Sequence, residues 1–242
     1  MQCRIRSWCA RVVPAALLAA FPTVASAYQG GPVANGGTIK GVVRFANTYP
    51  PPDTLEVTKD FEVCGQEKRD EKFIVSPATK GLKNVVVSLV DLARGKAFAP
   101  QAATLSQKGC QYVPHLVLLP AGGTLTILNE DGILHNVHTY SKANTPLNRA
   151  QPKFKPELKE TFTHPEIIKV TCDVHGWMSA YVVVEAHPYY TLSDENGAFQ
   201  LTDVPPGTYK LRAWHEVIGK MEKSVTVSTG HTAEVSFEIK PR

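Results

Sequence analysis

Three residues with metal-binding side chains lie close together in the sequence. Cys172, His175 and Met178 fall within one stretch of seven residues and offer a thiolate, an imidazole nitrogen and a thioether. Soft sulfur donors combined with imidazole are typical of copper, and two histidines with one cysteine and a weak axial methionine form the ligand set of electron-transfer copper sites. The spacing therefore predicts a redox metal centre that still needs a second histidine.

Two upstream histidines could complete this set. His135 follows an apolar segment and precedes Asn136, and His138 lies three residues further on. Residues three apart on an extended strand point to opposite faces of a sheet, so only one of the two histidines can face the cysteine loop. We expect His135 to be the ligand, with His138 as the alternative.

The segments around these ligands resemble known motifs. Residues 129–137 read Asn-x5-His-Asn-Val, which is similar to plastocyanin, and the tight Cys-x2-His-x2-Met loop at 172–178 is similar to amicyanin. The chain therefore resembles the cupredoxins, which implies a Greek-key β-sandwich with one type 1 copper ion. The ligands that the resemblance implies are His135, Cys172, His175 and Met178.

The same resemblance implies roles for neighbouring residues. Asn136 is expected to tie the strand of His135 to the cysteine loop, as metal ligands are commonly oriented by hydrogen bonds from residues around them. We also expect the ring edge of His175 to approach the surface. Flanked by Leu134 and Trp177, that edge is the predicted place where electrons enter or leave.

Two other interpretations of the ligand set stay open. Zinc also binds cysteine and histidine, although methionine is a poor zinc ligand. A buried cysteine and methionine can also simply fill a core, which would make the chain a degenerate cupredoxin without metal.

The N-terminus has the layout of a secretory signal peptide. Arg4, Arg6 and Arg11 precede an apolar run over residues 12–24, and Ala25-Ser26-Ala27 offers a small-residue cleavage site. We expect a signal peptide over residues 1–27, cleavage after Ala27, and a periplasmic or secreted protein. A transmembrane anchor is the alternative, but the run is shorter than the roughly 20 residues that a spanning helix needs. No membrane span is expected after cleavage.

Removal of the signal peptide would leave three cysteines, Cys64, Cys110 and Cys172. An odd number of cysteines in an exported protein indicates that one thiol has another task. If Cys172 binds metal, Cys64 and Cys110 remain as a candidate disulfide, which an oxidising compartment permits. The alternative is a second metal site formed by Cys64, Cys110 and His115, whose spacing matches no zinc template.

The pattern of the chain is all-β. Segments of strand character recur between clusters of proline and glycine, and no stretch shows a sustained helical period. The segments are Ile39 to Phe45, Val85 to Val90, Val113 to Leu119, Leu125 to Leu128, Ile167 to Val170, Tyr181 to Val184, Tyr209 to Ala213, Lys223 to Val227 and Ala233 to Ile239.

Two β-sandwich domains are expected. Residues 101–186 contain the ligands and form the predicted cupredoxin domain. Residues 194–211, with an Asp-Glu-Asn-Gly turn and a Val-Pro-Pro-Gly turn, resemble carboxypeptidase regulatory-like domains, which are small transthyretin-like sandwiches. Such domains begin with strands like those at 37–43 and 84–89. We therefore expect an accessory sandwich made of residues 37–100 and 187–242, with the cupredoxin inserted between its halves. The alternative is that the early strands belong to the cupredoxin.

Charge and motifs exclude several functions. The chain has 26 basic and 22 acidic residues, and loss of three leader arginines leaves 23 against 22, a net charge of +1, with no basic stripe for nucleic acid. There is no nucleophile elbow, phosphate loop or His-Glu-x-x-His motif, so no enzyme is predicted.

The expected function is that of an exported one-electron carrier. Its expected partner is a redox protein such as a periplasmic c-type cytochrome or an oxidoreductase. The alternatives are a non-redox envelope or carbohydrate-binding protein, which could bind polysaccharide, and a copper storage or delivery protein.

Overall fold

The computed structural model describes residues 28–47, 53–98 and 101–240. The predicted signal peptide over 1–27 lies outside the described residues. Regular structure in the described ranges is almost entirely β, with one short helix, α1 (Phe61–Cys64), so the all-β fold class is confirmed. In these same ranges no helix has the length and apolar character needed to cross a membrane.

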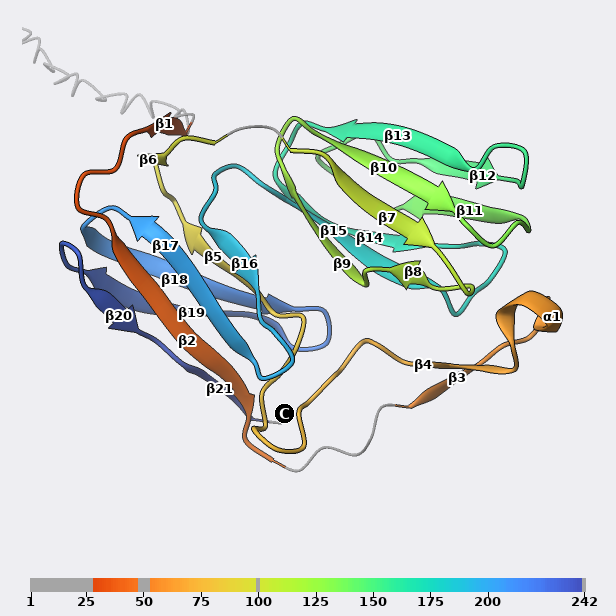
Figure 1. Cartoon of the computed structure of the whole chain (residues 1–242), viewed down its shortest axis with the longest axis horizontal. Coiled ribbons are helices and arrows are strands. Elements are labelled where there is room, and N and C mark those ends of the chain that lie inside the picture. The colour runs from red at the N-terminus through yellow and green to blue at the C-terminus, as the bar shows by residue number, and fades with distance from the viewer. Residues whose placement is uncertain (1–27, 48–52, 99–100, 241–242) are drawn as a thin grey trace, which may run out of the picture.

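Residues 103–185 form two facing sheets, here called the central sandwich (Figure 1). The first sheet has the order β13-β10-β7-β8, with β7 (Ala103–Gln107), β8 (Tyr112–Val113), β10 (Gly123–Asn129) and β13 (Glu157–Phe162). The second has the order β12-β11-β14-β15-β9, with β9 (Leu116–Pro120), β11 (His135–Thr139), β12 (Asn148–Gln151), β14 (Glu166–Thr171) and β15 (Ser179–Glu185). Leu105, Ile127, Phe162 and Val182 are among the buried side chains that fill the space between them.

Strands on either side of this segment form the flanking sandwich, with sheet orders β16-β5-β18-β19 and β17-β2-β20. The first sheet has β5 (Val86–Val90), β16 (Tyr190–Leu192), β18 (Gly207–His215) and β19 (Gly219–Val227). The second has β2 (Gly37–Phe45), β17 (Ala198–Val204) and β20 (Thr232–Glu234), with β21 (Phe237–Ile239) also paired to β2. A small parallel pair, β1 (Gln29–Gly31) and β6 (Arg94–Lys96), lies beside it. The chain leaves the flanking sandwich after β6 and returns to it at β16.

The two sandwiches pack against each other through their inner sheets. Leu116 on β9, Val183 on β15 and Val86 on β5 form one buried cluster, although they come from different sandwiches. The rings of Tyr181 and Trp214 meet edge to face, with centroids 5.2 Å apart. Four sheets are therefore stacked, and strands β5, β9 and β15 of the inner two are buried on both faces.

This stacking explains why several strands do not alternate between apolar and polar residues. On β15, Val182 faces the core of the central sandwich while Val183 faces the flanking sandwich. A strand that is covered on both faces is apolar at successive positions. A polar pair also spans the contact: half-buried Arg212 on β18 lies 3.4 Å from the buried carboxylate of Glu185 on β15.

The strand segments expected from the sequence are confirmed, with two differences. The segment from Val113 to Leu119 is divided between β8 and β9, which belong to different sheets of the central sandwich. The segment from Ala233 to Ile239 is two strands, β20 and β21, which both pair with β2. Between them the N–H of Val235 donates to the carbonyl of Lys40.

Residues 53–70, here called the strap, are the part of the fold that the sequence did not predict. The strap contains β3 (Thr54–Glu56), helix α1 and β4 (Glu67–Arg69), and Figure 1 shows it extending to the far end of the central sandwich. Cys64 on α1 is bonded to Cys110, which confirms the candidate disulfide. Both cysteines and Val57 are buried in the core of the central sandwich, so the strap is anchored there.

We predict that removing this disulfide destabilises the protein. The bond closes a segment with a sequence separation of 46, and the chain-entropy model gives about 4 kcal/mol for a loop of that length. Chemical denaturation of the Cys64→Ser/Cys110→Ser variant measures this difference. Cys172→Ser, which loses a thiol but keeps the bond, is the control. An unchanged unfolding free energy in the double variant would contradict the prediction.

Candidate metal centre

Three strand ends bring the main ligand candidates together. His135 is the first residue of β11, and Cys172 directly follows β14. These two strands are antiparallel neighbours, with His138 opposite Thr171, so the start of β11 lies beside the end of β14. His175 belongs to the loop that connects β14 to β15.

Their donor atoms converge. The Sγ atom of Cys172 lies 3.9 Å from Nδ1 of His135 and 3.8 Å from Nδ1 of His175. The two Nδ1 atoms are 2.9 Å apart, and the side chains of all three residues are buried. The sequence therefore identified a set of residues that the fold does gather at one point.

Met178 is held on the same loop. Its N–H donates to the carbonyl of His175 at 2.9 Å, and its carbonyl accepts from the N–H of Cys172 at 3.3 Å. These bonds close the seven-residue loop into a tight turn. Met178 itself is buried in the core of the central sandwich together with Cys172.

Asn136 links the two ligand-bearing segments. Its N–H donates to Sγ of Cys172 at 3.4 Å, and its side-chain oxygen accepts from the N–H of Asp173. Its side-chain nitrogen donates to Asn148 at 2.7 Å. Asn136 thus makes the strand-to-loop contacts expected of it, and it also donates a hydrogen bond to the thiolate.

Asp131 orients the ring of His135 and was missed by the sequence interpretation. Its carboxylate lies 2.9 Å from Nε2 of His135 and also accepts from the N–H of Cys110 at 2.8 Å. Asn129 shapes this loop, because its side chain accepts from the N–H of Asp131 and donates to the carbonyl of Ile133. The only sign of this contact in the sequence was that Asp131 lies four residues before His135.

A second carboxylate, Asp60 of the strap, holds His175. Its Oδ2 atom lies 2.8 Å from Nε2 of His175, and the side chain of His175 is 0% exposed. The expectation that the ring edge of His175 approaches the surface is therefore wrong, because the strap covers it. No local pattern could signal this contact, since the two residues are 115 positions apart.

The two residues of the predicted partner-facing patch differ in exposure. Leu134 is 48% exposed and lies next to His135. Trp177 is partly buried, with its ring 5.0 Å from that of His175 and its Nε1 donating to the carbonyl of Cys110. Leu134 is thus the member of the pair that is available at the surface.

The alternative ligands lie elsewhere. Nδ1 of His138 is 2.9 Å from Asp173, and its ring stacks on Tyr140 at 4.5 Å, outside the buried donor group. His115 contacts Glu216, and the two cysteines proposed to join it are bonded to each other. A second metal site at Cys64, Cys110 and His115 is therefore excluded.

The charges of the metal-free site follow from these contacts. Burial opposes protonation of His135, but the hydrogen bond to Asp131 and the interaction with Cys172 outweigh it and raise the pKa of His135 to about 9. Burial would raise the pKa of the Cys172 thiol, yet hydrogen bonds from His135 and the Asn136 N–H lower it. Burial lowers the pKa of His175. The site thus favours a thiolate, a protonated His135 and a neutral His175.

This arrangement suits a soft divalent or monovalent metal. If Asp60 accepts from Nε2–H of His175, then Nδ1 of that ring is a lone-pair donor, and one proton lies between the two Nδ1 atoms. A metal that replaces this proton would meet two neutral imidazoles and a thiolate, each already hydrogen-bonded from outside the centre. The donors present therefore fit a copper ion.

One family model matches the C-terminal part of the chain. A model of the carboxypeptidase regulatory-like domain matches residues 177–240. This match confirms the resemblance named for the C-terminal part, and it begins within the predicted cupredoxin segment. Among curated proteins no match is found.

Similar solved structures are copper proteins with cupredoxin folds. A copper-containing nitrite reductase from Thermus scotoductus is 22% identical over 38% of this chain and 24% of its own, with a TM-score of 0.33. A purple cupredoxin from Nitrosopumilus maritimus is 20% identical over 34% of this chain and 99% of its own, with a TM-score of 0.30. An amicyanin variant is 20% identical over 41% of this chain and 98% of its own, with a TM-score of 0.32. The metal chemistry of this centre is inferred from the donor atoms of His135, Cys172 and His175.

We predict that metal affinity rises with pH. Because His135 is protonated below a pKa of about 9 and must lose that proton to bind, affinity should increase about tenfold per pH unit between about pH 6 and pH 8. Titration with Co(II) at several pH values measures this slope.

Asp131→Asn supplies the control for this slope. Without the carboxylate the pKa of His135 falls, so the affinity should level off at a lower pH than in the unchanged protein. Affinity that does not vary with pH in the unchanged protein would rule out the protonated His135.

Proposed function

We propose that the chain is an exported type 1 copper protein that carries single electrons. The observation that supports this most directly is the convergence of two imidazole Nδ1 atoms on the buried Sγ of Cys172. A carrier, rather than an enzyme, fits a centre whose three donors are all buried.

The residues have different tasks in this proposal. Cys172 supplies the thiolate, and His135 and His175 supply neutral nitrogens that complete a trigonal set. Met178 is proposed as the weak axial donor from its position on the same closed loop. When bound, copper supplies the one-electron couple Cu(II)/Cu(I).

The surroundings of the donors favour electron transfer. The loop of Cys172 joins β14 to β15, and most residues of β15 are buried on both faces of the sheet. Ligands fixed in this way move little when the charge of the centre changes, so reorganisation is small. The proposed partner is a periplasmic redox protein such as a c-type cytochrome, and the proposed compartment is the periplasm or the exterior.

We predict that protein loaded with Cu(II) absorbs strongly at about 600 nm, because of charge transfer from the thiolate to copper. Cys172→Ser should lose the band, and His135→Ala should lose or shift it. His138→Ala is the matched control, because this ring lies outside the donor group and its loss should leave the band unchanged. Absence of the band in the unchanged protein would favour a non-redox binding protein.

We also predict that Leu134 contributes to contact with the redox partner. A buried negative charge at an apolar contact is costly, so Leu134→Asp should slow electron exchange with a c-type cytochrome by about tenfold while leaving the absorption band intact. Stopped-flow mixing measures the rate.

Val217→Asp is the control for this substitution. Val217 is also an exposed apolar residue, but it lies on the turn between β18 and β19 of the flanking sandwich. Equal slowing by both variants would mean that the added charge acts generally and that Leu134 has no special role.

A further inference from the structure

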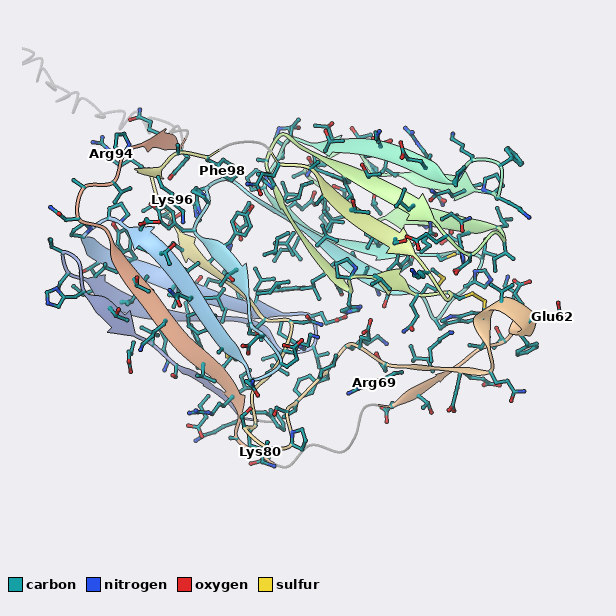
Figure 2. All side chains as sticks on the ribbon, viewed as in Figure 1. Glu62, Arg69, Lys80, Arg94, Lys96 and Phe98 are labelled. Atoms are coloured by element: carbon teal, nitrogen blue, oxygen red, sulfur yellow. A yellow bond between two sulfur atoms is a disulfide. The ribbon has the colours of Figure 1, made fainter. Side chains whose placement is uncertain are left out.

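The strap extends from the flanking sandwich to the metal centre. It lies in sequence between β2 and β5, which are both strands of the flanking sandwich. Its anchors are nevertheless in the central sandwich, where Cys64 bonds Cys110 and the carbonyl of Arg69 accepts from Gln111. Figure 2 shows Glu62 on α1 and Arg69 on β4 along this segment.

Asp60 is the residue of the strap that reaches the centre. It directly precedes α1 and has a positive φ of 53°, a conformation that aspartate, asparagine and glycine tolerate best. Its carbonyl accepts from the N–H groups of Val63 and Cys64, which ties its position to the disulfide. The carboxylate is thereby directed at Nε2 of His175, 2.8 Å away.

The contact is asymmetric in exposure. The His175 side chain is 0% exposed, whereas that of Asp60 is 44% exposed. The carboxylate therefore lies at the boundary between the buried ring and solvent. It contacts the ring at Nε2, the nitrogen that points away from the sulfur of Cys172.

A carboxylate at this position has two physical effects. It fixes the tautomer and rotation of the ring, because accepting from Nε2–H leaves Nδ1 free and aimed at Cys172. Its negative charge, next to a ligand and partly shielded from water, also stabilises the more positive oxidation state of the centre. Asp131 does the same for His135, so each imidazole has its own carboxylate.

We propose that Asp60 is a positioning residue of the metal centre, supplied by the strap, which orients His175, lowers the reduction potential and closes the His175 edge to the exterior. This inference rests on the proposed copper function. It assigns to the strap a role in the site, and it moves the route of electrons away from the His175 edge.

The first test compares reduction potentials of the copper-loaded protein. Asp60→Asn keeps a hydrogen-bond acceptor and tolerates the positive φ, but removes the charge. It should shift the relative affinity toward Cu(I) by about tenfold, which is a rise of about 59 mV for one electron. Glu62→Gln removes an equal charge from exposed α1 without a contact to the ligands and should shift the potential much less. Equal shifts in the two variants would overturn the proposed role of the Asp60 contact.

The second test uses metal-free protein and so does not depend on copper binding. Diethyl pyrocarbonate modifies accessible imidazoles, and peptide mapping reports each histidine separately. His175 should be protected in the unchanged protein and in Asp60→Asn, relative to exposed His231. Asp60→Gly, which suits the backbone but has no side chain, should expose His175 and raise its modification rate at least about tenfold.

The two tests fail in distinguishable ways. If no copper centre forms, the proposed function fails, while protection of His175 in metal-free protein still decides whether Asp60 closes the edge. If copper binds but His175 is modified as fast as His231 in the unchanged protein, the closing role of Asp60 is wrong. Equal protection in Asp60→Gly would also overturn it.

Discussion

The arrangement of the centre depends on one constraint: two imidazoles point Nδ1 at the same buried sulfur. Each ring must then direct Nε2–H away from the centre into protein, where a buried donor without an acceptor is costly. Asp131 accepts from His135 and Asp60 accepts from His175. The loop over residues 129–135 and the strap are thus understood as the parts of the chain that supply these two acceptors.

The disulfide connects these two parts. Cys110 bonds Cys64, the last residue of the helix that Asp60 precedes, and the N–H of Cys110 donates to Asp131. Trp177, packed on His175, donates to the carbonyl of the same Cys110. The buried disulfide therefore joins Asp60, Asp131 and Trp177, the three residues around the two imidazoles, into one network. Behind this network, β15, the strand that follows the cysteine loop, is buried on both faces over most of its length.

How much the sequence predicts depends on how local each feature is. Cys172, His175 and Met178 share one short loop, so their spacing alone indicated the chemistry, and His135 was found from the motif around it. The all-β class followed from strand-like segments between turns. Asp60 could not be found in this way, because only the fold brings it to His175 from 115 positions away. The exposed edge predicted for His175 was wrong for the same reason.

The most direct test of the account is X-ray absorption at the copper edge of protein loaded with one Cu(II). The account predicts one short copper–sulfur bond together with two nitrogen ligands, and loss of the sulfur contribution in Cys172→Ser. A first shell of nitrogen and oxygen alone in the unchanged protein would contradict it, because copper would then be bound away from Cys172.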